Sequence, residues 1–133
     1  MGWELAAAGN QHGALLELDA ATMEAQRAGW PATVVDSRVG NIQYRLGQLV
    51  DAELSLSRAL DTPPPRRAWV LCSLAHTYLG SGEVDAAAEA LEEGFLLTRT
   101  HGIPARLPRI LAVRSLLPPG RAARELDEVM QSA

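Results

Sequence analysis

A recurring spacing of small residues is the feature of this sequence that most constrains its fold. A small residue is followed after seven residues by a glycine, after five more by an alanine and after four more by a leucine; the positions are Ala75, Gly82, Ala87 and Leu91. The same series occurs 35 residues earlier, at Gly40, Gly47, Ala52 and Leu56, and 38 residues before that, at Gly2, Gly9, Ala14 and Leu18. Because touching helices need small residues and reversing chains favour glycine, this period predicts repeated antiparallel helix pairs.

The apolar periodicity and the wealth of alanine and leucine predict an all-α domain with about seven helices. Residues 1–8 are expected to be the tail of a first helix, and the further expected helices are 11–28, 32–46, 49–61, 66–80, 84–100, 105–117 and 121–131. Prolines separate several of them, because proline lacks an N–H group and clashes with the preceding turn. In the segment 105–117, the residues expected to face the core are Leu107, Ile110, Leu111 and Leu117.

The repeat register divides a single domain, 1–133, into four parts. Residues 1–31 form a partial first repeat, 32–65 the second, 66–104 the third, and 105–133 a degenerate repeat with a C-terminal capping helix. Met1 falls in the middle of a first helix in this register, and a helix array needs covered ends. Two alternatives follow: the chain is a fragment of a longer repeat protein, or its exposed end docks on another chain, such as a second copy in a homodimer.

The 74–97 stretch, with its ladder of small residue, aromatic, glycine, alanine and large apolar residue, resembles a tetratricopeptide repeat (TPR). Residues 40–53 and 121–128 look like the C-terminal TPR region of actinobacterial helix-turn-helix regulators. The resemblance implies a right-handed stack of antiparallel helical hairpins, an α-solenoid. It also implies that the first helix of each hairpin lines a concave groove for partners.

Charge is unevenly distributed along the chain, whose net charge is −4. The segment 99–124 carries six arginines and no acidic residue, whereas the segment 83–93 is acidic. The arginines could contact a partner or pair with the acidic helix. An acidic chain is a poor match for nucleic acid, so we expect no nucleic-acid partner.

Candidate catalytic and metal-binding groups are sparse. The three histidines (His12, His76 and His101) form no metal-binding pair motif, and Cys72 is the single cysteine. A free cysteine is more often a buried core residue than a nucleophile. We therefore expect no metal, no cofactor and no enzymatic activity. With one cysteine, no signal peptide and no apolar run of bilayer length, we expect a cytoplasmic protein without a membrane contact.

The predicted function is a non-enzymatic interaction module, regulatory in role, that binds a peptide, a protein segment or a small ligand in the groove. An asparagine amide can both donate to and accept from a peptide backbone, and arginine can bind a carboxylate bidentately. The candidate groove residues are Ser37, Arg38, Asn41, Tyr44, Arg45, Trp69, Cys72, His76, Arg106 and Arg109. The alternatives are ordinary helix-surface residues, or a small-ligand enzyme or cyclase of a natural-product pathway using His76 and Tyr44.

Overall fold

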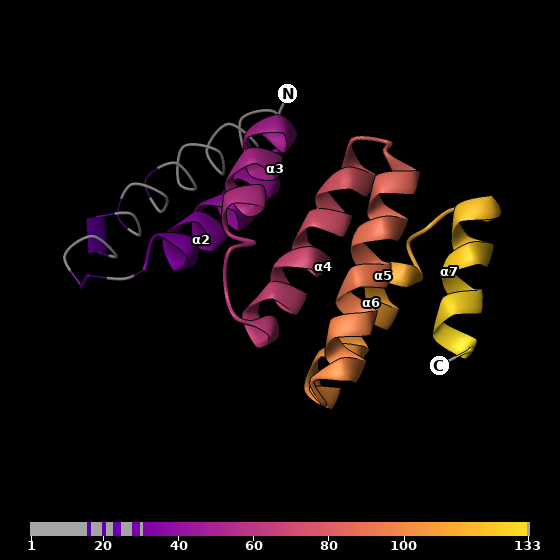
Figure 1. Ribbon diagram of the computed structural model, residues 1–133. Coiled ribbons are helices and arrows are strands. Elements are labelled where there is room, and N and C mark those ends of the chain that lie inside the picture. Colours follow the sequence, from indigo (N-terminus) through magenta and orange to yellow (C-terminus); the bar gives the residue numbers. More distant parts are fainter. Residues whose placement is uncertain (1–15, 17–19, 21–22, 25–27, 30, 133) are drawn as a thin grey trace, which may run out of the picture.

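The computed structural model describes residues 16, 20, 23–24, 28–29 and 31–132, and every regular element among them is helical. The elements are α2 (Ala32–Arg45), α3 (Leu49–Arg58), α4 (Pro64–Gly80), α5 (Val84–Thr100), the 3-10 helix η1 (Pro104–Arg106), α6 (Leu107–Arg114) and α7 (Arg121–Gln131) (Figure 1). The expected all-α class is thus confirmed for this part of the chain. The partial first repeat, 1–31, and the dimer contact suggested for it lie largely outside the described residues.

Helix boundaries follow the proline and glycine signals, with two informative differences, in α4 and α6. Helix α4 begins at Pro64, two residues before the expected start. Proline fits the first turn of a helix, because its fixed φ is helical and its missing N–H has no acceptor there. Helix α6 ends at Arg114, shorter than the expected 105–117, and η1 takes the place of its first residues.

Helices α2 and α3 form one antiparallel hairpin, and α4 and α5 form another (Figure 1). Gly47 and Gly82 close the first helix of each hairpin with φ of +77°, which only glycine adopts at little cost. The hydrogen bonds repeat as well: the Gln48 N–H donates to the Gln43 carbonyl as the Glu83 N–H donates to that of Tyr78. These are Schellman helix ends, and they recur at the 35-residue displacement of the sequence pattern.

The small residues of the pattern lie between helices, as predicted. Ala52, Ala75 and Ala87 are fully buried. At Gly40 on α2, a Cβ atom would lie 2.6 Å from the Leu56 Cγ on α3, far inside van der Waals contact. The two helices of this hairpin therefore approach at a distance that only glycine permits at this position.

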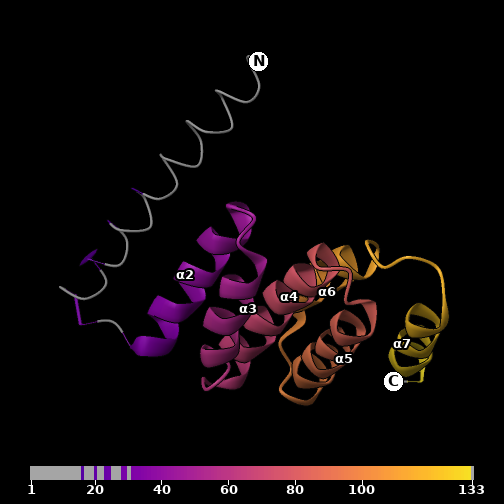
Figure 2. The same ribbon diagram turned by 90° about the horizontal axis from the view of Figure 1, so that it is seen from above.

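The largest core cluster joins α4, α5, α6 and α7, and a smaller one joins α3 to α4. Contacts within each hairpin are more extensive than those between α3 and α4. Figure 2 shows the hairpins following one another along the molecule. The prediction that Leu111 faces the core was wrong: it is 48% exposed. Ile110 and Val113 fill the core side of this short helix. Because each residue of an α-helix is rotated by about 100° from the one before it, Leu111 points away from the side on which Ile110 is buried.

Helix α7 follows residues 118–120 and packs against α5. Ala123 and Leu126 are its buried residues. The Nε and Nη2 atoms of the Arg114 guanidinium group donate to the two carboxylate oxygens of Asp127, at 2.7 and 2.6 Å. This bidentate pair ties the end of α6 to α7. No helix within the described residues is long and apolar enough to cross a membrane.

Candidate functional site

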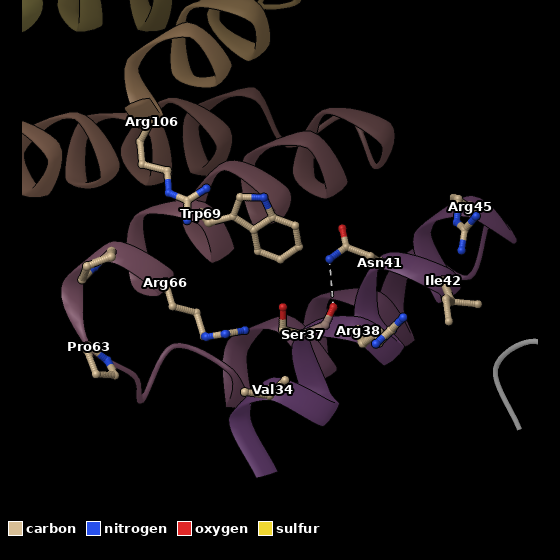
Figure 3. A pocket seen from close by; sticks show the side chains of 11 residues that line it. Val34, Ser37, Arg38, Asn41, Ile42, Arg45, Pro63, Arg66, Trp69 and Arg106 are labelled. Carbon is tan, nitrogen blue, oxygen red and sulfur yellow. Dashed lines mark hydrogen bonds between the residues drawn. The ribbon is translucent and has the colours of Figure 1, made fainter. Parts of the chain in front are cut away.

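A groove of about 830 Å³, open to solvent, lies between α2, the first turns of α4 and η1 (Figure 3). Its described lining residues are Val34, Ser37, Arg38, Asn41, Ile42, Arg45, Pro63, Pro65, Arg66, Trp69 and Arg106. On α2 they recur every three or four residues, which places them along one side of the helix. The groove is thus lined by the first helices of two consecutive hairpins.

Six of the ten residues predicted for the groove line it: Ser37, Arg38, Asn41, Arg45, Trp69 and Arg106. The other four, Tyr44, Cys72, His76 and Arg109, are not among the described lining residues. Sequence reasoning missed the apolar and proline part of the wall, as well as Arg66. The expected helix begins at residue 66, whereas α4 begins at Pro64, and this added first turn carries Arg66 into the groove.

The polar centre of the groove is Asn41. One N–H of its side-chain amide donates to the Ser37 carbonyl oxygen, at 2.9 Å (Figure 3). This bond lies within α2 and fixes the direction of the amide. Because an amide carries two N–H donors and a carbonyl acceptor, the second N–H and the oxygen remain for other partners.

Arginine dominates the charge of the groove. Four guanidinium groups line it, on Arg38, Arg45, Arg66 and Arg106, and none of the described lining residues is acidic. Two nearby carboxylates are engaged elsewhere: Asp36 pairs with Arg58 at 3.3 Å, and Glu93 pairs with Arg67 at 2.7 Å. The groove wall is therefore cationic although the chain as a whole is acidic.

For the 99–124 arginines, partner contact and pairing with the acidic segment 83–93 were both left open, and Arg121 does lie beside Asp85 and Glu89 of that segment. Two of these arginines form ion pairs with carboxylates of α7: Arg114 pairs with Asp127, and Arg121 with Glu125. Arg106 faces the groove, and the Arg109 guanidinium carbon lies 5.5 Å from the centre of the Trp69 ring, within cation–π range.

The residues suspected for catalysis are not among the described lining residues of the groove, and Cys72 belongs to the core cluster of α4, α5, α6 and α7. Cys72 is 1% exposed, and burial raises the pKa of its thiol to about 11, although Arg109 and Arg106 act in the opposite direction. Since the thiolate is the nucleophile, a thiol with so high a pKa is a poor one at neutral pH. No group of three or more His, Cys, Asp or Glu residues in the described part of the chain is placed to hold a metal ion.

His76 contacts Tyr44 across the α2–α4 seam, with ring centres 4.7 Å apart and planes inclined by 39°. Burial lowers the pKa of His76, and the positive charge of Arg109 lowers it further. A neutral imidazole packed against an aromatic ring joins the two hairpins next to the groove.

Searches for similarity found no matching protein family, no matching curated protein and no matching solved structure.

Proposed function

We propose that this chain is a TPR-type interaction module, a right-handed stack of helical hairpins that binds a segment of another protein in the groove between α2 and α4. The module has no catalytic role in this proposal; it acts by holding its partner, as a regulatory protein does. One observation carries the proposal: consecutive first helices, which the repeat pattern relates by 35 residues, together line one cationic and partly apolar groove.

The lining favours an acidic peptide or protein segment over a neutral small ligand. Val34 and the prolines offer an apolar surface to side chains, while Arg66 and Arg106 offer donors to carboxylates. Asn41 lies between them, with amide capacity left for a peptide backbone. A groove of about 830 Å³ that stays open to solvent can hold several residues of extended chain.

An enzyme or cyclase using the same groove is the competing proposal, and the contact of Tyr44 with His76 is the observation in its favour. Neither residue is among the described lining residues of the groove. A general acid or base must reach its substrate within hydrogen-bond distance, so their position in the seam supports the interaction module over the enzyme.

The test is the retention of a degenerate library of peptides of about nine residues on the immobilised chain. We expect the double variant Asn41→Ala/Arg45→Ala to lose most of the retained peptide. The matched control is Gln131→Ala/Arg124→Ala, which likewise removes one side-chain amide and one guanidinium group, here from the exposed surface of α7. Circular dichroism should show that both variants fold. Equal retention by the groove variant and the control would refute the proposal.

A further inference from the structure

One end of the groove concentrates positive charge. Arg66, in the first turn of α4, and Arg106, at the end of η1, both extend into this end, and Trp69 forms the wall near them (Figure 3). Neither arginine forms an ion pair with any residue that the structure describes. The field of this cluster reaches into the protein, because Arg106 and Arg109 both act to lower the pKa of buried Cys72.

The placement of Arg66 is unfavourable for the chain on its own. The first turn of α4 contains no acidic residue, and a cation there opposes the positive end of the helix dipole. Its neighbour Arg67 avoids this conflict by pairing with Glu93 and donating to the Leu60 carbonyl oxygen. Arg66 is exposed and has no such pairing among the described residues, so its guanidinium group is available to an anion that enters the groove.

The geometry points to a tetrahedral dianion as that anion. A planar carboxylate is satisfied by the fork of a single guanidinium group, whereas a phosphate monoester carries nearly two charges and presents three oxygens in different directions. Arg66 and Arg106 belong to separate elements, α4 and η1, and can approach such a group from two sides. We propose that this end of the groove binds a phosphorylated side chain of the partner segment, an inference that rests on the peptide-binding function proposed above.

Nucleic acid carries phosphates too, but the aromatic wall suits it less well. Binding of single strands relies on bases stacked on aromatic faces. The Arg109 guanidinium lies over the Trp69 ring at 5.5 Å and occupies one of its faces. The apolar side chains of the wall, on Val34, Pro63 and Pro65, instead match the flanking side chains of a peptide.

The test uses three oriented peptide pools with a degenerate sequence around one fixed central residue: phosphoserine, glutamate or serine. Each pool is passed over the immobilised full chain, and the retained peptide is quantified by mass spectrometry. We expect the phosphoserine pool to be retained about tenfold better than the glutamate pool, because it offers a second charge and more acceptors. Arg66→Gln and Arg106→Gln should each remove this preference. Arg124→Gln, which deletes one exposed arginine of α7, should leave it intact.

The outcomes separate the two proposals. Equal retention of the phosphoserine and glutamate pools overturns the phosphate site and leaves the peptide groove standing. Failure to retain any pool overturns both. Stronger retention of degenerate RNA decamers than of the phosphoserine pool, lost in Arg66→Gln, also overturns both and assigns the site to nucleic acid. A thermal melt of each variant shows whether lost retention comes from the site or from unfolding.

Discussion

The close contact between Gly40 and Leu56 allows a test in which glycine-to-alanine substitution should destabilise the fold at Gly40 and stabilise it at Gly94. Replacing glycine by alanine inside a helix stabilises it by about 0.8–1 kcal/mol when the new methyl group meets no obstacle. At Gly40 the methyl carbon would lie 2.6 Å from the Leu56 Cγ and 3.3 Å from the Ala52 carbonyl oxygen. Leu56 is fully buried, so it cannot turn away into solvent.

Overpacking of this kind costs about 1–3 kcal/mol. Subtracting the gain in helix propensity, we expect Gly40→Ala to lower the free energy of unfolding by up to about 2 kcal/mol. The matched control is Gly94→Ala in α5. There the methyl carbon would lie 3.6 Å from the Leu71 Cβ and 3.7 Å from the Ala68 carbonyl oxygen, which is ordinary contact. Gly94→Ala should therefore stabilise the protein by up to about 1 kcal/mol.

Urea unfolding followed by circular dichroism measures both free energies, and the difference between the variants isolates the steric cost. A double-mutant cycle with Leu56→Ala sharpens the assignment. Truncating Leu56 removes the clashing Cγ, so Gly40→Ala should be less harmful in that background, or favourable. If Gly40→Ala stabilises the protein as much as Gly94→Ala does, the close approach of α2 and α3 is wrong, and the argument from small residues fails with it.

Three further predictions concern ionisable groups. Cys72, with a pKa of about 11, should react with a thiol reagent at neutral pH only as fast as the protein unfolds, so rapid labelling of the native chain would contradict its burial. The hydrogen bond from Arg114 lowers the pKa of Asp127, so the pair stabilises the fold at pH values above the usual pKa of aspartate, and this stabilisation is lost as the pH falls through the lowered pKa. Urea midpoints of Asp127→Asn should therefore depend less on acid than those of the unmodified chain. Burial lowers the pKa of His76, so its contribution to stability is present above about pH 6.5 and is lost as the pH falls through the lowered value. An NMR titration that gives His76 an ordinary or raised pKa would contradict this.

Much of the hairpin geometry could be predicted because it depends on local chemistry. Gly47 and Gly82 mark chain reversals that need a positive φ, and Ala52 and Ala87 mark helix contacts; both signals are visible in residue identity and spacing. Leu111 shows where this reasoning fails. In a helix as short as α6, the apolar pattern alone does not decide which of two adjacent large residues faces the core.

The lining residues of the groove could be predicted from the sequence where they lie along α2, but not where they depend on the residue at which α4 begins. Asn41 and Arg45 share one side of α2, as the spacing indicated. Arg66 was missed because proline both ends and begins helices, and the sequence does not say which role Pro64 has. Tyr44 and His76 were assigned to the groove but contact each other beside it, since the exact rotation of α2 against α4 depends on tertiary packing.

The limited contact between the α2–α3 and α4–α5 hairpins has a consequence for partial unfolding of the chain. Because α3 contacts α4 less extensively than α4 contacts α5, the α2–α3 hairpin should detach as a unit from the α4–α5 hairpin, and its amides should exchange with deuterium sooner than those of α4 and α5. The groove spans this joint, so a bound segment would hold both sides together and slow that exchange. Binding of a partner and association of the two hairpins are then one linked equilibrium, in which the partner stabilises the contact between them.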